Sequence, residues 1–118
     1  MEGPKPGIEV GLRISVEQPS DGSFLVAVSG ELDISNSKSL EDAVSMARDK
    51  GAKALVLDLR GLTFMDSSGL RLLIDAWNEA NVADRKLSIV VPPGGLVRRL
   101  LEITGCDDVL PIVEDSAG

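Results

Sequence analysis

The chain has 118 residues, the size of one domain, and 43% of them are hydrophobic but only 3% aromatic. A formal net charge of −7 disfavours nucleic acid and anionic lipid surfaces as partners, because both are negatively charged. The apolar runs are far shorter than the roughly 20 residues that a membrane-spanning helix needs. We therefore expect one domain with an aliphatic core and no nucleic-acid or membrane partner. The single cysteine fits a cytoplasmic location.

The N-terminal part of the chain predicts a hairpin. Residues 1–10 are rich in Gly and Pro and lack periodicity, so they are expected to form a flexible leader before a domain that spans residues 11–118. Leu12, Ile14 and Val16 alternate with polar residues, a pattern typical of a strand at a sheet edge. After turn residues at 19–22, the run 24–28 is apolar on both faces, which predicts a more central strand paired antiparallel to the first.

The remaining pattern alternates helices with strands. Apolar residues recur at helical spacing from Ser37 until Gly51, and the apolar run 54–59 predicts a buried parallel strand reached by that helical crossover. A second helical stripe, expected to face the sheet, is formed by Leu70, Leu73, Ile74 and Trp77. A strand at 87–91, a helix at 96–101 closing at Gly105, and a short edge strand at 109–113 complete the chain.

These elements predict a fold of the α/β class. We expect a single domain with a mixed four- to five-stranded sheet, an N-terminal antiparallel hairpin and helices covering the sheet.

Several kinds of chemistry are excluded by composition. The chain has no histidine, so a Ser-His-acid hydrolase and a histidine-ligated metal site are both absent. No phosphate-binding loop of the G-x-x-x-x-G-K-[ST] type occurs. The acidic pairs Asp107-Asp108 and Glu114-Asp115 are typical of a solvated surface. We therefore predict no enzyme activity, no cofactor and no metal site.

The most informative segment is residues 58–70, where a buried strand is expected to run into a short loop and then a helix. Asp66 is suited to cap that helix, which places Ser67 and Ser68 in its first turn, beside backbone N–H groups without intrahelical partners. A phosphate on Ser68 would gain from this helix terminus, although Asp66 would oppose it by like-charge repulsion. The spacing alone leaves open an ordinary helix start in which Gly69 merely relieves crowding.

Three motifs together resemble the landmarks of the STAS domain of anti-sigma factor antagonists. They are Gly30-Glu31-Leu32-Asp33, the strand exit Leu57-Asp58-Leu59, and Thr63-Phe64-Met65-Asp66-Ser67-Ser68-Gly69-Leu70. Residues 97–105 resemble the next helix of that family, and the match runs in order from about Leu12 to Val113. The chain departs from the pattern at residues 81–84, which lack a glycine, and at Cys106, where the family usually has an aliphatic residue.

The resemblance implies a site in which Ser68 accepts a phosphoryl group. Asp33, Asp66, Ser67 and Gly69 are then expected to surround it, although the residues alone also allow Asp33 to be a helix-entry cap or turn residue. The expected partner-binding residues lie in the two adjoining loops and at the helix start: Ile34, Ser35, Asn36, Thr63, Phe64, Met65, Leu70 and Arg71.

The resemblance also implies a partner-switching function. The unphosphorylated form is expected to bind an anti-sigma factor serine kinase and release a sigma factor, phosphorylation of Ser68 to block binding, and a serine phosphatase of the PP2C type to restore it. The free chain is expected to be a monomer. One alternative is a STAS interaction module in a lipid-transport, transporter-associated or stressosome-like complex without sigma control. Another is a small enzyme or ligand-binding domain, but convergent catalytic residues are missing for it.

Overall fold

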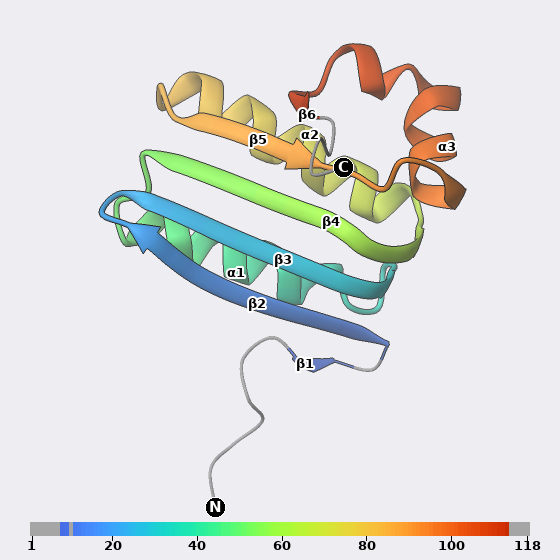
Figure 1. The fold of residues 1–118 in the computed structure, drawn as a ribbon, viewed down its shortest axis with the longest axis horizontal. Helices are drawn as coiled ribbons and strands as arrows, with labels where there is room; N and C mark the ends of the chain where they lie inside the picture. The colour runs from blue at the N-terminus through green and yellow to red at the C-terminus, as the bar shows by residue number, and fades with distance from the viewer. Residues whose placement is uncertain (1–7, 10, 114–118) are drawn as a thin grey trace, which may run out of the picture.

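The computed structural model describes residues 8, 9 and 11–113 and forms one α/β domain. Its elements are β1 (Ile8–Glu9), β2 (Leu12–Ser20), β3 (Ser23–Leu32), α1 (Ser37–Asp49), β4 (Ala54–Met65), α2 (Ser67–Val82), β5 (Lys86–Val90), α3 (Gly95–Thr104), a short 3-10 turn (Cys106–Asp108) and β6 (Ile112–Val113). The strands lie in chain order in one mixed sheet, with β1, β2 and β3 antiparallel and β3 to β6 parallel (Figure 1). The predicted fold class is confirmed. Two two-residue strands at the edges raise the strand count to six.

The N-terminal hairpin forms as predicted, with a two-residue turn at Asp21 and Gly22 between β2 and β3. The expectation that β2 is an edge strand is wrong, because β1 pairs antiparallel with its outer side. A two-residue strand has no periodicity to read, so the sequence pattern did not reveal it. Most of the predicted leader, and residues 114–118 with Glu114-Asp115, lie outside the described residues.

Strand β4 is about twice as long as predicted. It continues through residues 60–65, where a short loop was expected, and pairs with β3 up to Met65. The register between β3 and β4 shifts twice in this stretch, and such irregularities break the alternation that a sequence pattern relies on. Strand β5 pairs only with residues 54–58 of β4, so the final part of β4 has no strand beside it on that side and is packed against α3 instead.

Helices α1 and α2 cover one face of the sheet, behind it as drawn in Figure 1. Consequently the β4 side chains alternate between buried residues at Leu55, Leu57 and Leu59 and half-buried ones, although the run is apolar except for Asp58. The expected stripe of α2 is partly wrong, because Ile74 is exposed and Leu72 is buried beside Leu73. The buried line of α2 runs through small residues that let the helix approach the sheet closely: Gly69, Ala76 and Ala80.

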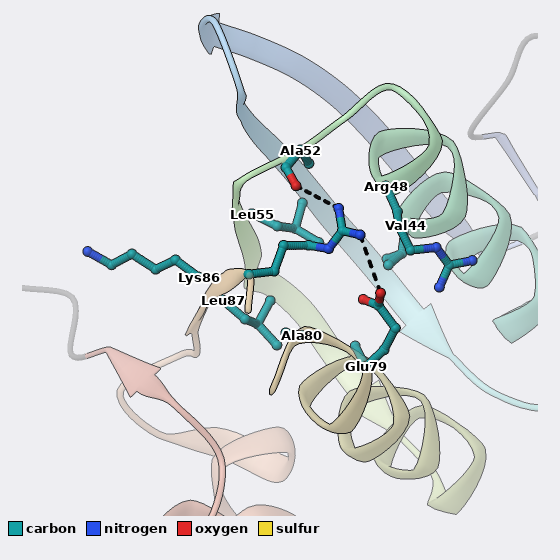
Figure 2. Close-up of a pocket in the computed structure, with 10 residues that line it drawn as sticks. Val44, Arg48, Ala52, Leu55, Glu79, Ala80, Lys86 and Leu87 are labelled. Atoms are coloured by element: carbon teal, nitrogen blue, oxygen red, sulfur yellow. Dashed lines mark hydrogen bonds and ion pairs between the residues drawn. The ribbon is translucent and has the colours of Figure 1, made fainter. Parts of the chain in front are cut away.

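A half-buried arginine ties the far ends of α1, β4 and α2 together. The Arg85 guanidinium donates to the carbonyl oxygen of Ala52 at 2.6 Å and lies 3.4 Å from the Glu79 carboxylate (Figure 2). Its aliphatic stem packs in a pocket with Leu55 and Leu87 among the lining residues. This contact lies at the N-terminal end of the parallel strands, opposite the end where the predicted site is found.

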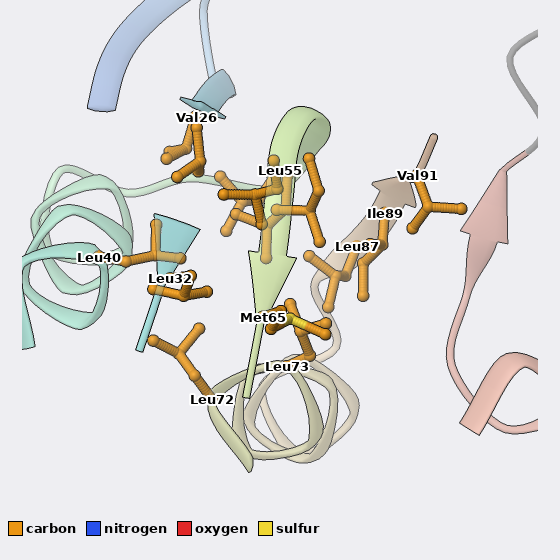
Figure 3. Packing of buried hydrophobic residues seen from close by; sticks show 14 of the residues in the cluster. Val26, Leu32, Leu40, Leu55, Met65, Leu72, Leu73, Leu87, Ile89 and Val91 are labelled. Atoms are coloured by element: carbon orange, nitrogen blue, oxygen red, sulfur yellow. The ribbon is translucent and has the colours of Figure 1, made fainter. Parts of the chain in front are cut away.

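The core is aliphatic, as the composition predicts. Figure 3 shows side chains from β3, β4 and β5 meeting those of α1 and α2, with Leu40, Leu57, Leu73 and Ile89 completely buried. Each such side chain contributes about 1.5–3 kcal/mol by leaving water. Close packing on this face therefore fixes where α1 and α2 begin relative to the strands. Among the helices of the described part, none is long and apolar enough to cross a bilayer.

Candidate functional site

The predicted site lies where the parallel strands β3 and β4 end. Both strands leave the sheet at the same edge, and each leads into a helix on the covered face (Figure 1). The two exits are joined directly, since the backbone N–H of Asp66 donates to the carbonyl oxygen of Leu32 at 3.2 Å. The loop at 33–36 and the start of α2 are therefore neighbours, as the sequence predicts.

Asp66 caps α2, which confirms the role predicted for it. One oxygen of its carboxylate, Oδ1, accepts the backbone N–H of Ser68 at 2.9 Å and the hydroxyl of Ser68 at 2.5 Å. The extended backbone of Asp66 (φ −103°, ψ −170°) allows its side chain to reach forward over the first turn. The Ser68 hydroxyl is thus held at the helix N-terminus, half-buried, while Ser67 is exposed.

The electrostatics of this cap favour an ionised carboxylate. The hydrogen bond from the Ser68 hydroxyl is the largest cause that lowers the pKa of Asp66 below its usual value. Partial burial acts in the opposite direction, and backbone N–H groups of Ser68, Gly69 and Ile34 add to the lowering. At neutral pH a negative charge therefore lies against the Ser68 hydroxyl.

The loop between β3 and α1 repeats the same local geometry. Oδ1 of Asp33 accepts the backbone N–H of Ser35 at 2.9 Å and its hydroxyl at 2.6 Å. Asn36 precedes α1, is only 3% exposed, and is the only fully buried polar residue in the described part of the chain. Its amide accepts from the backbone N–H of Asp33 and donates to the carbonyl of Glu31, both at 2.9 Å. The turn role that the residues alone allowed for Asp33 is therefore present.

Asp66 also reaches across to this second loop. Its Oδ2 accepts the backbone N–H of Ile34 at 3.3 Å, while the Ile34 side chain is 81% exposed. A large apolar side chain is thus presented to solvent on a loop whose backbone is held from both sides. Such an exposed, fixed apolar residue is suited to docking a partner.

The structure divides the predicted partner-binding residues into two groups. Exposed side chains, which are available to a partner, belong to Ile34, Ser35, Thr63, Phe64 and Arg71. Leu70 is half-buried against the core, and Asn36 and Met65 are buried. The side chains of the last two support the loop from inside and do not form part of its surface. Asp58, in the middle of β4, is bound to Arg60 and lies away from the site.

Gly69 is required by packing at the start of α2. A Cβ added there would lie 2.5 Å from Cγ of Met65 and 2.8 Å from Cδ2 of Leu32, which is closer than real side chains approach. The crowding that the sequence suggested is therefore present. The neighbouring Ser68 is half-buried, whereas Gly69 is buried, so this packing does not enclose the Ser68 side chain.

One feature of the site was not predicted from the sequence. A groove of about 230 Å³ between α1 and α2 is lined by Ser68 together with Lys38 and Arg71, and Lys38 was not among the predicted residues. The parallel order of the strands was the available signal, because it brings successive helix starts to one edge. Within the described residues, no cluster of three side chains suited to a metal ion occurs.

Comparisons with known proteins agree with this geometry. A family model described as the STAS domain matches residues 13–117. The anti-sigma-B factor antagonist of Staphylococcus aureus strain NCTC 8325 / PS 47 is 30% identical over 104 residues, covering 87% of this chain and 95% of that protein. The corresponding protein of Staphylococcus epidermidis is 31% identical over 94 residues, covering 80% and 86%.

Solved structures give the same result. An anti-sigma factor antagonist from Mycobacterium paratuberculosis matches with a TM-score of 0.76 and 31% identity over 86% of this chain and 84% of that one. The phosphorylated form of the Bacillus cell fate determinant SpoIIAA shares the fold, with a TM-score of 0.68, 20% identity, and coverage of 88% and 92%. The chain therefore belongs to the STAS domain family, and its similar relatives within that family are anti-sigma factor antagonists.

Proposed function

We propose that this chain is an anti-sigma factor antagonist controlled by phosphorylation. The unphosphorylated form binds an anti-sigma factor serine kinase and so releases a sigma factor in the cytoplasm, and a phosphate on Ser68 blocks that binding. The observation that carries the proposal is the Ser68 hydroxyl, held by Asp66 in the first turn of α2 beside the exposed Ile34. A serine phosphatase of the PP2C type regenerates the binding form.

The physical basis of the switch is the cost of burying a new charge. Phosphorylation adds about −1.5 to −2 charges at a single point. When that point lies within a docking face, its hydration must be removed on binding, and this is costly when the partner offers no matching positive charge. A change of about 1.4 kcal/mol weakens binding tenfold, so a few kcal/mol suffice and the domain does not need to refold.

The names of similar proteins support this proposal. Curated relatives of 30–31% identity are anti-sigma-B factor antagonists, and SpoIIAA, which shares the fold, has been solved in unphosphorylated and phosphorylated forms. Under the proposal the chain is a substrate and ligand of other proteins. We expect the purified protein to have no ATPase, kinase or hydrolase activity, since it contains no histidine and no phosphate-binding loop.

The proposal is tested by incubating the protein with candidate anti-sigma factor kinases and ATP, followed by intact mass measurement and site mapping. We expect one added phosphate, located on Ser68. Ser67→Ala is the matched control, because Ser67 is the exposed neighbour, and it should still accept phosphate. A phosphate mapped to Ser67 would overturn the assignment. If pull-downs recover a STAS-containing assembly and no anti-sigma factor, the chain acts without sigma control.

A further inference from the structure

Two basic side chains share the groove between α1 and α2 with Ser68. Lys38 belongs to the first turn of α1, and Arg71 follows Ser68 by three residues, so it lies on the same side of α2. Both line the groove of about 230 Å³ together with Ser68. The groove is large enough for a phosphate group, and Ser68 is half-buried at its wall.

The present partners of these cations are weak. Nζ of Lys38 lies 3.3 Å from the Glu41 carboxylate and 3.0 Å from that of Asp42, and Nε of Arg71 lies 3.9 Å from the Asp75 carboxylate. The Lys38 and Arg71 side chains are 76% and 84% exposed, and ion pairs between exposed groups contribute little. Either cation can therefore exchange its carboxylate for another anion at small cost.

A backbone N–H group that could bind a phosphate at the start of α2 is already bound to Asp66. A phosphate at a helix start normally takes the free backbone N–H groups of the first turn. Here the Asp66 carboxylate holds the N–H of Ser68 and adds a negative charge of its own. A phosphate on Ser68 is thus repelled by Asp66 and needs a counter-charge from elsewhere, and two cations, Lys38 and Arg71, line the groove with Ser68.

We infer that Lys38 and Arg71 form a clamp that holds the phosphate of phosphorylated Ser68 in the groove between α1 and α2. This inference rests on the proposed function, since it concerns the phosphorylated form. In the clamp, the phosphate oxygens accept from the Lys38 ammonium and the Arg71 guanidinium, and the carboxylates of Glu41, Asp42 and Asp75 are left to solvent. Arg71, exposed in the unmodified protein, is withdrawn from the docking face at the same time, so phosphorylation changes that face at two points.

The test uses the full chain with phosphoserine incorporated at position 68 during translation, so it needs no kinase. Phosphorus NMR at about 0.15 M salt measures the second pKa of the phosphate, which lies near 6 in the free group. A clamp stabilises the dianion. We therefore expect this pKa to be higher by about half a unit or more when Lys38→Gln and Arg71→Gln are combined. The carboxylates of Glu41 and Asp75, which line the same groove, and that of Asp66, which contacts Ser68, are unchanged in this comparison.

Two controls separate a clamp from a general effect of charge. Lys53→Gln removes an exposed cation at the opposite end of β4 and should leave the phosphate pKa unchanged. Lys38→Arg combined with Arg71→Lys keeps both charges and should retain most of the shift. If the combined glutamine variant moves the pKa no more than Lys53→Gln does, the clamp is refuted. A kinase that fails to phosphorylate the chain would count against the proposed function and leave this result intact.

Discussion

The two loops at the site use one local motif for two purposes. In each, an aspartate accepts the backbone N–H and the hydroxyl of the serine two residues later through the same oxygen, Asp33 from Ser35 and Asp66 from Ser68. Ser35 precedes α1 and is exposed, whereas Ser68 lies inside the first turn of α2 and is half-buried. Under the proposed function, the hydrogen-bond motif alone does not define the switch, because both loops have it. The position of the serine relative to the helix start distinguishes Ser68 from Ser35.

Removing each serine should give the largest contrast between the loops. Ser68→Ala is expected to abolish phosphorylation by the anti-sigma factor kinase, while folding normally and still binding it, because alanine suits the first turn of a helix. Ser35→Ala should leave phosphate uptake intact, since Ser35 lies outside any helix. Radiolabelled phosphate transfer to both variants measures this. If only Ser35→Ala loses phosphate uptake, the phosphoacceptor is Ser35 and the assignment to Ser68 is wrong.

Asn36, which follows Ser35, should contribute to the stability of the fold. Asn36→Ala is expected to lower the free energy of unfolding by about 1–3 kcal/mol, because the N–H of Asp33 and the carbonyl of Glu31 lose their buried partner. Urea denaturation is the measurement. Asn36→Asp keeps an acceptor for the Asp33 N–H but places a charged oxygen against the carbonyl of Glu31 in a buried position, so it should cost at least as much as Asn36→Ala. A variant as stable as the parent would contradict the supporting role given to Asn36.

Replacing each aspartate should have a smaller effect on stability. Asp66→Ala removes a helix cap and the bond to Ile34, so we expect a loss of about 0.5–2 kcal/mol. Asp33→Ala removes bonds to an exposed serine and should cost less than Asp66→Ala. Both variants are compared by urea denaturation at pH 7. Equal losses of unfolding free energy in the two variants would mean that the cap at Asp66 stabilises the fold no more than the bonds between Asp33 and Ser35 do.

The pH dependence of the cap is the smallest expected effect. The pKa of Asp66 is lowered in the folded state, so the unfolded chain takes up the proton first as the pH falls. The stability that the ionised carboxylate contributes is fully present above the unfolded pKa of about 3.9 and is lost as the pH falls through the lowered folded pKa. The difference in unfolding free energy between the parent and Asp66→Ala should therefore shrink below about pH 4. A difference that grew on acidification would have the wrong sign.

Much of this architecture could be predicted because it is recorded in local patterns. The alternation in β2, the helical spacing in α1 and the cap at Asp66 each depend on residues close in sequence. The second half of β4 could not be predicted, since register shifts against β3 interrupt its pattern. The rotation of α2 that exposes Ile74 was missed for another reason. It follows from the close approach at Gly69, which involves Leu32 from another strand.

The site was predictable to a similar extent. The cap at Asp66, with Ser68 in the first turn, follows from a strand leading into a helix, whereas the place of Ile34 beside it was implied by the resemblance to the STAS family. The burial of Asn36 and the place of Lys38 in the groove depend on how α1 packs beside α2, and no local pattern records that packing. The sequence pattern therefore did not reveal contacts between elements that are distant in the chain.

The central claim is that a phosphate on Ser68 prevents the docking of an anti-sigma factor kinase. Calorimetric titration of that kinase with the unmodified chain and with the chain carrying phosphoserine at position 68 tests it most directly. We expect the phosphorylated chain to bind at least about tenfold more weakly, a difference of about 1.4 kcal/mol or more, with the same melting behaviour. Equal affinity of the two forms for the kinase would contradict the account.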